Sequence, residues 1–260
     1  SLPKFSKIIV IENSFDEELK RELEAKYDNI EVMLNENLGM GASNNIGLRK
    51  SNTKFAFILN PDVVFEDNTF SNLIENIKDI DDFSILSPIN ENDLLPNFEI
   101  KGNYLNINKN ILEVDVIDGF SMLINKSKFE NQNYFDENFF LYLENTDLCL
   151  RQRKKKEKIY IIKNSKIKHL GSYTTKQDLS YSLEYLRNWH WMWSKFYFNK
   201  KHYGFLTAII KTFHNLISAF LKFIFYSILF NNHKKKIYKM RLLGLLNSII
   251  GNKSVLRPDL

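Results

Sequence analysis

One stretch decides the fold of this chain: Phe55-Ala56-Phe57-Ile58-Leu59-Asn60-Pro61-Asp62-Val63-Val64. It begins with a short apolar run that is typical of a buried strand. Proline cannot donate to a sheet ladder and it favours extended backbone in the residue before it, so we expect the strand to end at about Asn60. Asp62 then lies just past the carboxyl end of the strand, where open α/β sheets bind their ligands.

A carboxylate at that position suits a divalent cation, which in turn can hold phosphates. The alternative is an ordinary transition from strand to turn, because Asn, Pro and Asp are all common turn residues. The rest of the chain has to decide between these two interpretations.

The residues around this stretch alternate between strand and helix patterns. We expect strands at 7–11, 30–34, 55–60, 83–86, 114–124 (broken by Gly119) and 159–162. We expect helices at 16–26 and 67–79, and a further helix into which the loop 35–47 runs and which ends at about residue 51. Residues 90–110 are polar and predict a loop or hairpin. The alternation in the first 65 residues favours a parallel sheet of the nucleotide-binding type.

A loop rich in Gly and Asn precedes the second helix, with Gly39 and Gly41 inside it. Neither the Gly-x-Gly-x-x-Gly spacing nor a Walker loop is present. We therefore favour a tight loop that approaches some other part of a ligand closely, with a phosphate cradle as the alternative.

Two carboxylates, Glu144 and Asp147, stand three residues apart at an expected helix start and so share one face. They are either acidic residues that favour the helix N-terminus, or a general base beside a bound sugar or phosphate. His169 follows an apolar run at an expected strand end, where a structural role competes with metal binding beside a carboxylate such as Asp62.

The composition, 260 residues with 44% hydrophobic residues, allows one α/β domain with a helical appendage. The single cysteine, Cys149, excludes a disulfide framework and a multi-cysteine metal site, and a reducing compartment is the simplest assumption. The net charge is +5, and Lys and Arg gather from Arg151 onward, which indicates an anionic partner such as lipid or nucleic acid. The first residues do not have the pattern of a signal peptide.

We divide the chain into a nucleotide-sugar-type domain at 1–180 and an aromatic, basic helical segment at 181–260. The apolar run 205–230 is long enough to span a bilayer, but Lys211, His214 and Lys222 interrupt it and favour a helix that lies in the membrane interface. Lysines at 234–236 would then meet anionic headgroups. The alternative is a helical bundle that packs on the first domain.

Taken together, these pieces resemble the inverting family 2 glycosyltransferases of the GT-A fold, especially the bacterial rhamnosyltransferase-like enzymes that build surface polysaccharides such as lipopolysaccharide. The resemblance covers roughly residues 7–200. The residues that carry it are Val10-Ile11-Glu12-Asn13-Ser14, the loop 37–47, Leu59-Asn60-Pro61-Asp62, Gly119, the patch 135–151, His169 and Arg187-Asn188.

The resemblance implies a fold and a set of roles. The fold would be α/β, a mostly parallel GT-A sheet flanked by helices, with a C-terminal helical segment. Asp62 and His169 would bind Mg²⁺ or Mn²⁺. The donor would contact Glu12, Asn13, Asn37, Gly39, Asn44, Asn60 and Asp62, while the acceptor would contact Gly119, Asp118 and Arg151.

Two features depart from the family pattern. The chain starts near the second family strand, so we expect the first strand to be missing. Glu144-Asn145 stands where the family commonly has Glu-Asp, and asparagine cannot act as a base at neutral pH. We therefore assign the base to Asp147 first and to Glu144 second.

The sequence thus predicts a metal-dependent inverting glycosyltransferase that uses a nucleotide-sugar donor, dTDP-rhamnose or a UDP-hexose. Its acceptor would be a cell-surface glycan precursor, free or lipid-linked, reached by peripheral contact with the cytoplasmic face of the bacterial plasma membrane. The alternative is a catalytically degenerate homologue that serves as a binding subunit in polysaccharide assembly. A nucleic-acid partner is not expected, although a basic and aromatic segment of this kind would bind DNA in a salt-dependent way.

Overall fold

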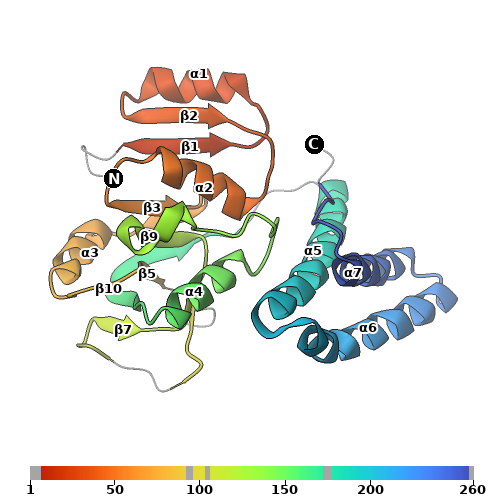
Figure 1. Ribbon diagram of the computed structural model, residues 1–260. Helices are drawn as coiled ribbons and strands as arrows, with labels where there is room; N and C mark the ends of the chain where they lie inside the picture. The colour runs from red at the N-terminus through yellow and green to blue at the C-terminus, as the bar shows by residue number, and fades with distance from the viewer. Residues whose placement is uncertain (1–6, 92–95, 103–105, 172–176, 258–260) are drawn as a thin grey trace. The chain divides into compact units, whose positions relative to one another are not determined.

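The computed structural model describes residues 7–91, 96–102, 106–171 and 177–257. The chain forms two compact units, which are described separately (Figure 1). Unit 1 consists of residues 1–36, 42–136 and 144–173, and unit 2 of residues 37–41, 137–143 and 174–260.

Unit 1 alternates strands with helices, as the sequence predicts. Its helices are α1 (Glu17–Lys26), α2 (Met40–Lys50, which starts in the loop assigned to unit 2), α3 (Thr69–Ile77) and α4 (Glu144–Lys154). Its strands are β1 (Ile8–Glu12), β2 (Ile30–Leu34), β3 (Phe55–Leu59), β4 (Val63–Phe65), β5 (Ile85–Asn90), β6 (Phe98–Glu99), β7 (Ile111–Glu113), β8 (Val116–Ile117), β9 (Ser121–Asn125) and β10 (Ile159–His169). Short 3₁₀ turns occupy Lys126–Lys128 and Glu130–Gln132.

The sheet is mixed, whereas the sequence predicted a mostly parallel one. Strands β1 and β2 pair in parallel in a two-stranded sheet of their own. Strands β5 and β10 pair in parallel within a six-stranded sheet of order β3-β9-β5-β10-β4, with β7 beside β10. The other pairings of that sheet are antiparallel. All five residues of β9 are buried, and its central run Met122-Leu123-Ile124 is apolar on both faces, as in a central parallel strand, so it does not report the direction of the strand.

Strand β10 is longer than the predicted 159–162 because a bulge lies in its middle. The register against β5 shifts between Ile162 and Lys166. The polar residues of this bulge face α3, where the Asn164 carbonyl accepts a hydrogen bond from Asn72 and Ser165 Oγ donates to the Thr69 carbonyl at 2.8 Å. The bulge interrupts the side-chain alternation by which a strand is predicted. Beyond the bulge, the strand continues as far as His169.

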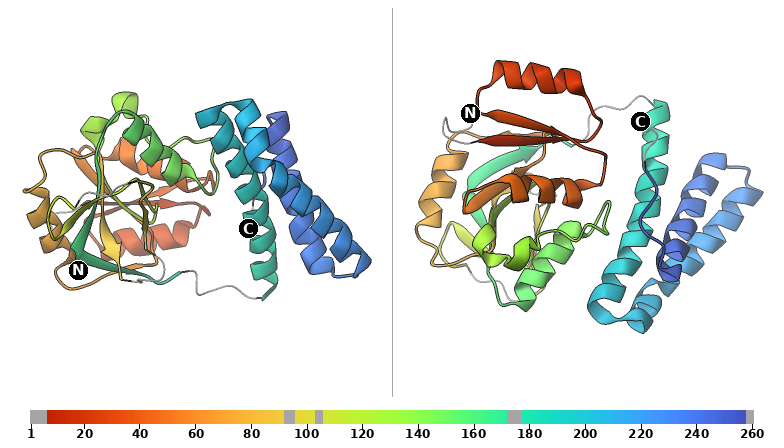
Figure 2. Two further views of the ribbon diagram at one scale, coloured as in Figure 1. Left: turned by 90° about the horizontal axis from the view of Figure 1, so that it is seen from below. Right: turned by 45° about the horizontal axis from the view of Figure 1, so that its top comes forward.

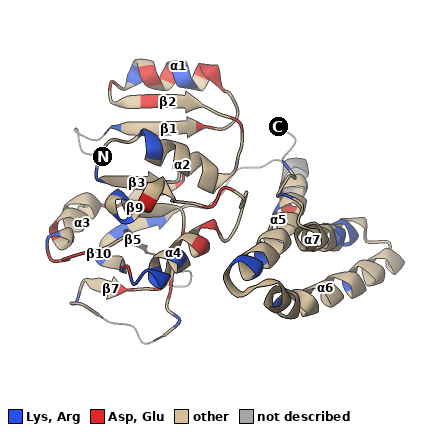
Figure 3. Cartoon of the chain, in the orientation of Figure 1, with Lys and Arg blue, Asp and Glu red and all other residues tan. Residues whose placement is uncertain are grey.

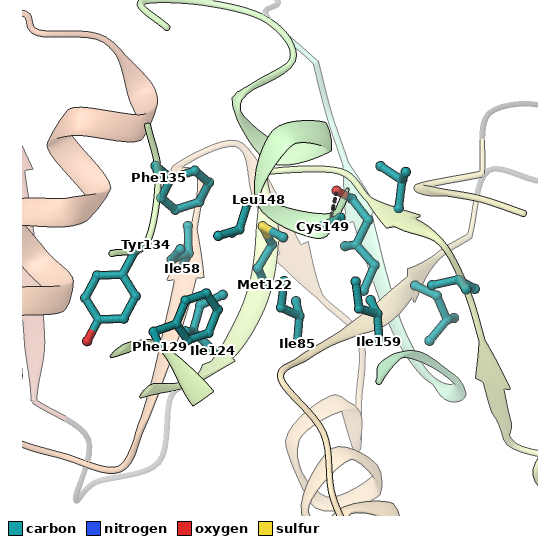
Figure 4. Close-up of a cluster of buried hydrophobic side chains, with 14 of the residues drawn as sticks. Ile58, Ile85, Met122, Ile124, Phe129, Tyr134, Phe135, Leu148, Cys149 and Ile159 are labelled. Atoms are coloured by element: carbon teal, nitrogen blue, oxygen red, sulfur yellow. Dashed lines mark hydrogen bonds between the residues drawn. The ribbon is translucent and has the colours of Figure 1, made fainter. Parts of the chain in front are cut away.

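The main core of unit 1 lies between the six-stranded sheet and α4 (Figure 4). It is built of buried aliphatic and aromatic side chains, among them Ile58, Ile85, Met122, Ile124, Phe135, Leu148 and Ile159. Cys149 belongs to this core and has no solvent exposure. Burial raises the pKa of its thiol to about 12, so the residue is a packing group.

Unit 2 is a helical bundle of α5 (Gln177–Tyr203), α6 (Phe205–Ile228) and α7 (Asn232–Ile250), seen from two further sides in Figure 2. The three helices pack on one another around Met192, Phe196, Ala208 and Leu245. Gly244 permits a close approach of α7 to α5, because a Cβ there would collide with the Trp189 carbonyl.

Residues 137–143 pack on α5, and residues 37–41 approach them at Gly39, which faces the backbone of Phe140. Ser194 Oγ donates to the Leu141 carbonyl at 2.7 Å, and the Phe139 ring meets the Tyr197 ring edge-on. Within the residues that the structure describes, α6 alone is long and apolar enough to cross a membrane, and 17% of its most apolar window is buried.

Candidate active site

The turn after β3 brings Asp62 to the end of β10. The Asn60 N–H donates to the Phe120 carbonyl at 2.9 Å, and the Val63 N–H donates back to the Asn60 carbonyl at 3.2 Å. Strand β4 then runs antiparallel to β10, with Val63 opposite His169. The proline therefore ends one strand and starts the reversal that places Asp62 beside a histidine.

Asp62 and His169 form a close pair, with 3.2 Å between Asp62 Oδ2 and His169 Nε2. The other carboxylate oxygen, Asp62 Oδ1, is buried and has no hydrogen-bond partner in the described structure. The imidazole is held flat against the Phe120 ring, at a centroid distance of 4.1 Å and an interplanar angle of 9°. Asn90 Oδ1 accepts the His169 backbone N–H at 3.2 Å, which further fixes this strand end.

The chemistry of this pair fits a divalent cation. A carboxylate oxygen suits Mg²⁺ and Mn²⁺, and an imidazole nitrogen is a common metal ligand. Asp62 Oδ1 has no hydrogen-bond partner in the described structure, and a bound cation would fill that place. No cluster of three His, Cys, Asp or Glu that could hold an ion is present in the described part of the chain. The protein thus offers two ligands, which suits an ion that takes its others from phosphates and water.

Glu144 opens α4 and is almost completely buried, with 4% exposure. Burial raises the pKa of its carboxyl to about 7, since desolvation penalises the charged form. Its Oε2 atom is buried and lacks a hydrogen-bond partner among the described residues. A carboxyl group that titrates near neutrality is well matched to proton transfer.

Asp147, one turn along α4, has a different environment. Its side chain has no solvent exposure, and Arg151 Nε lies 2.9 Å from its carboxylate. The same guanidinium donates to the carbonyls of Asn133, at 3.1 Å, and Tyr134. Arg151, which the resemblance placed on the acceptor side, is therefore engaged in holding Asp147 and the chain before α4.

The segment from Ile117 to Phe120 connects the start of α4 to the Asp62–His169 pair. Asn145 Nδ2 donates to the Ile117 carbonyl at 2.9 Å, and Phe120, three residues on, stacks against His169. Asp118 and the buried Gly119 lie between these two contacts. The pKa of Asp118 is raised, by desolvation first and then by Glu99, while the nearby His169 acts to lower it. One segment of four residues thus contacts both the start of α4 and the predicted metal pair, and Asp118 lies between the two contacts.

Three of the residues predicted for the donor, Glu12, Asn13 and Asn44, lie at the end of β1 and in α2. Ser43 Oγ donates to Asn13 Oδ1 at 2.8 Å. Asn44 Nδ2, the next residue along α2, is buried without a partner in the described structure. Glu12 accepts the backbone N–H groups of Ser14 and Asp16. Burial acts to raise its pKa, but hydrogen bonds from Ser14 and Asp16 outweigh burial and lower it.

Asn37 and Gly39 lie in unit 2. Asn37 Oδ1 accepts the Gly39 N–H at 3.2 Å. Gly39 has φ of +92°, and a Cβ there would collide with the backbone of Phe140. The sequence predicted that a ligand approaches closely at this loop. In the structure, the backbone of Phe140 makes a close approach to Gly39.

Three residues near these groups were not foreseen. Phe120 stacks on His169, and its only signal in the sequence is its place directly after Gly119 in a broken strand. Asn90 fixes the backbone of His169, and no pattern in the sequence marks it. Asn45, inside the Gly/Asn loop, is fully buried and bonds the Phe135 backbone through both of its amide atoms at 2.9 Å, so its role is structural.

Unpartnered polar atoms concentrate on the predicted residues. Six buried side-chain atoms lack a hydrogen-bond partner within the described ranges, on Asn44, Asp62, Ser121, Glu144, Gln152 and Asn215. Three of those residues were singled out by sequence, and Ser121 directly follows Phe120. Because such atoms are costly and rare in native proteins, those on Asn44, Asp62 and Glu144 are candidates for contact with a ligand.

A family model described as glycosyl transferase family 2 matches residues 3–149, more than half of the chain. The chain belongs to this family. The resemblance drawn from sequence is confirmed, and with it the expectation of a glycosyltransferase at the level of the family.

Two curated relatives have similar sequences. The low-salt glycan biosynthesis hexosyltransferase Agl10 of Haloferax volcanii is 28% identical over 174 residues, 57% of this chain and 54% of that protein. The rhamnosyltransferase WbbL of Escherichia coli K12 is 28% identical over 173 residues, 56% of this chain and 65% of that protein. The matched region thus spans between half and two thirds of each relative.

Solved structures of glycosyltransferases share the fold. The mannosyltransferase PcManGT of Pyrobaculum calidifontis has a TM-score of 0.53 at 9% identity, covering 94% of this chain and 77% of its own. GalNAc-T7 has a TM-score of 0.51 at 15% identity, and the match covers 63% of this chain and 37% of the GalNAc-T7 chain. TarS of S. aureus has a TM-score of 0.50 at 12% identity, covering 97% and 85%. These likenesses confirm the predicted GT-A α/β fold.

Proposed function

We propose that this protein is a metal-dependent inverting glycosyltransferase that moves a sugar from a nucleoside-diphosphate donor to a hydroxyl group of a glycan acceptor. One observation carries the proposal. The Asp62–His169 pair, with its unpartnered carboxylate oxygen, is joined through residues 117–120 to the start of α4, where Glu144 has a pKa of about 7. A charge-binding group and a proton acceptor held by one short segment are what this reaction needs.

On the donor side, Asp62 and His169 would hold Mg²⁺ or Mn²⁺. Such a cation, when bound, neutralises the charge that develops on the departing diphosphate. The unpartnered Asn44 amide can donate a hydrogen bond to the nucleotide sugar, and Phe120 keeps the His169 ring in a fixed orientation. Solved relatives support this assignment, since GalNAc-T7 was determined with UDP and Mn²⁺, and PcManGT with GDP-Man and Mn²⁺.

On the acceptor side, we assign the general base to Glu144. The acceptor hydroxyl gives up its proton as its oxygen bonds to the anomeric carbon from the face opposite the diphosphate. One such displacement inverts the anomeric configuration. Asp147, the first choice from sequence, is less suited, because Arg151 holds its carboxylate, whereas Glu144 Oε2 has no hydrogen-bond partner among the described residues. Asp118 and Gly119 remain our assignments for acceptor contact.

The donor sugar and the setting are proposed from the relatives and the C-terminal unit. A hexosyltransferase and a rhamnosyltransferase among the relatives support a UDP-hexose or dTDP-rhamnose. Polysaccharide assembly, including lipopolysaccharide, would supply a glycan or lipid-linked glycan acceptor. Peripheral contact at the cytoplasmic face of a bacterial plasma membrane fits the basic helices of unit 2.

Hydrolysis of the donor in the absence of acceptor tests the proposal. We expect a panel of nucleotide sugars with Mn²⁺ to reveal one that is hydrolysed, and Asp62→Ala to lower that rate by at least about 100-fold. Asp79→Ala, which removes an exposed aspartate of the same unit, should leave the rate unchanged. An Asp62→Ala protein as active as the wild type would refute the metal assignment.

A catalytically degenerate binding subunit is the second candidate, and Asn145 favours it. The amide of Asn145 donates to the Ile117 carbonyl, which a carboxylate in its place could not do. This candidate predicts that a nucleotide sugar with Mn²⁺ raises the melting temperature of the wild type, as any ligand of the native state does, while no donor is turned over.

A further inference from the structure

Helix α6 carries a continuous apolar surface that the described structure leaves open to solvent. We call this surface the apolar stripe; it consists of Leu206, Ile210, Phe213, Ile217, Phe220, Leu221, Ile224 and Ile228. Their spacing of three or four residues places them along one face of the helix. Their exposures run from 39% at Ile224 to 76% at Leu206, so the whole length of the face is open.

The opposite face of α6 is the one that packs in the bundle. Ala208, Thr212 and Ala219 are buried there, and Ile209 and Leu216 join the core shared with α5 and α7. The apolar stripe is therefore not needed for the fold of unit 2. A continuous exposed apolar surface of this kind marks an interaction site.

The charge around the apolar stripe is of one sign. Residues 185–258 contain 13 Lys and Arg and no Asp or Glu, so residues 185–260 have a net charge of +12 whereas residues 1–184 have −7. Figure 3 shows the same contrast between the two units. Exposed ammonium groups lie on α6 and α7, at Lys211, Lys222, Lys234, Lys236 and Lys239. Two of these ammonium groups, both on α6, lie over aromatic rings: Lys211 over Tyr203 and Lys222 over Tyr238.

We infer that α6 lies in the plane of an anionic phospholipid surface, with the apolar stripe inserted among the acyl chains and the lysines of α6 and α7 at the headgroups. An apolar face beside a cationic one is the pattern by which helices bind such interfaces. This inference refines the membrane contact proposed above. It stands on different residues from the glycosyl transfer, so either can fail without the other.

A membrane-spanning α6 fits the contacts less well. Its 24 residues measure about 36 Å, enough to cross a bilayer. However, α6 packs on α5 and α7, and α7 begins with a run of lysines at 234–236. Lys211 and Lys222 lie within α6 itself. Crossing the membrane would bury these charges in hydrocarbon, which is costly.

A second copy of the chain is also a poor occupant. Symmetric packing through the apolar stripe would set the same cationic surface against itself. No acidic residue between positions 185 and 258 is present to offset the repulsion. Anionic lipid complements both the apolar and the cationic part of the surface.

Vesicle co-sedimentation of the full chain tests the partner. We expect binding to phosphatidylcholine vesicles that contain about 30% phosphatidylglycerol, at least ten-fold weaker binding to phosphatidylcholine alone, and weakening as salt rises from about 0.1 M to about 0.5 M. The triple variant Leu206→Glu, Ile210→Glu, Ile228→Glu alters positions that are 68–76% exposed and should lose binding at least ten-fold. The control Ile74→Glu, at a 53% exposed site on α3, should bind as the wild type does.

Depth measurements test the orientation. Spin labels on Leu206→Cys, Ile217→Cys and Ile228→Cys can be attached selectively, because the native Cys149 is fully buried and its pKa is about 12. The outer two sites are about 33 Å apart along the helix. An in-plane helix places all three labels at one shallow depth. Labels at steadily changing depths, or a concentration-dependent dimer without vesicle binding, would overturn the inference.

Discussion

At the scale of single residues, Glu144 is the group whose environment most constrains the chemistry. Its carboxyl is buried at the start of α4, and its pKa is raised to about 7 because burial penalises the charged form. The protonation state of this one side chain therefore changes within an accessible pH range. Both the rate and the stability of the protein should respond to it.

Glu144→Gln should remove the proton acceptor while keeping its size. We expect kcat to fall by roughly 10²- to 10⁴-fold, with Mn²⁺-dependent donor binding unchanged. In the wild type, kcat should rise with pH and level off above about 7, since only the deprotonated carboxylate accepts a proton. Steady-state kinetics from pH 5 to 9 measure this. A variant with the wild-type kcat would return the role to Asp147.

The same substitution should change how stability depends on pH. The pKa of Glu144 is about 7 in the folded state and 4.5 in the solvated, unfolded chain, so the folded state binds more protons between these two values. Stability from this group is present below about pH 4.5 and is lost as pH rises through about 7. Glu144→Gln does not ionise, so it should melt a few degrees above the wild type at pH 8, with a smaller advantage at pH 5.

Calorimetry or circular dichroism at the two pH values measures that difference. Glu18→Gln, at an exposed position on α1, is the control and should show no such trend. A pH-independent gap between Glu144→Gln and the wild type would argue against the raised pKa.

At the scale of elements, the loop before α2 depends on one glycine. Gly39 has φ of +92°, and it faces the backbone of Phe140 without room for a side chain. Gly39→Ala should therefore lower the free energy of unfolding by roughly 2–4 kcal/mol, through backbone strain and the collision. Urea denaturation measures this.

Gly102→Ala is the matched control, because no atom would lie within 4 Å of its new Cβ and its backbone needs no positive φ. We expect it to leave the urea midpoint close to that of the wild type. A Gly39→Ala protein with an unchanged midpoint would mean that this loop separates from residues 137–143 at no cost.

At the scale of the whole molecule, Cys149 reports on whether unit 1 stays folded. The thiol lies in the main core with no exposure and a pKa raised to about 12 by burial (Figure 4). We expect negligible reaction with a thiol reagent at pH 8 in native buffer and stoichiometric reaction in denaturing urea. Ser71→Cys, exposed on α3, should react at once in both. Rapid native labelling of Cys149 would show that the core opens locally.

Much of the fold could be predicted because local patterns specified it. The turn residues Asn60 and Pro61 ended β3 where expected, and the 30–34 strand and the 55–59 strand core coincide with β2 and β3. Strand direction escaped prediction, because a strand buried on both faces, such as β9, has the same apolar run either way. The second half of β10 escaped because its polar bulge breaks the periodicity.

The candidate site divides in the same manner. Its chemistry-bearing residue types, Asp62, Glu144 and His169, stood at element ends, where the sequence marks them. The contacts around them did not follow from it: Phe120 stacks on His169, and the Asn145 amide beside Glu144 donates to the Ile117 carbonyl. These contacts join residues whose proximity depends on sheet order and on the packing of α4.

By itself, the sequence determined the family, the alternation of strands and helices from β1 to β3, the aspartate after β3 and the cationic C-terminal unit. These properties reside in local patterns and in composition, which need no distant neighbour. Only the tertiary structure decided that Asp62 meets His169, that Glu144 rather than Asp147 has an unengaged carboxylate oxygen, and which face of α6 stays open. The physical reason is that burial, pKa and pairing are set by groups that are distant in the chain and near in space.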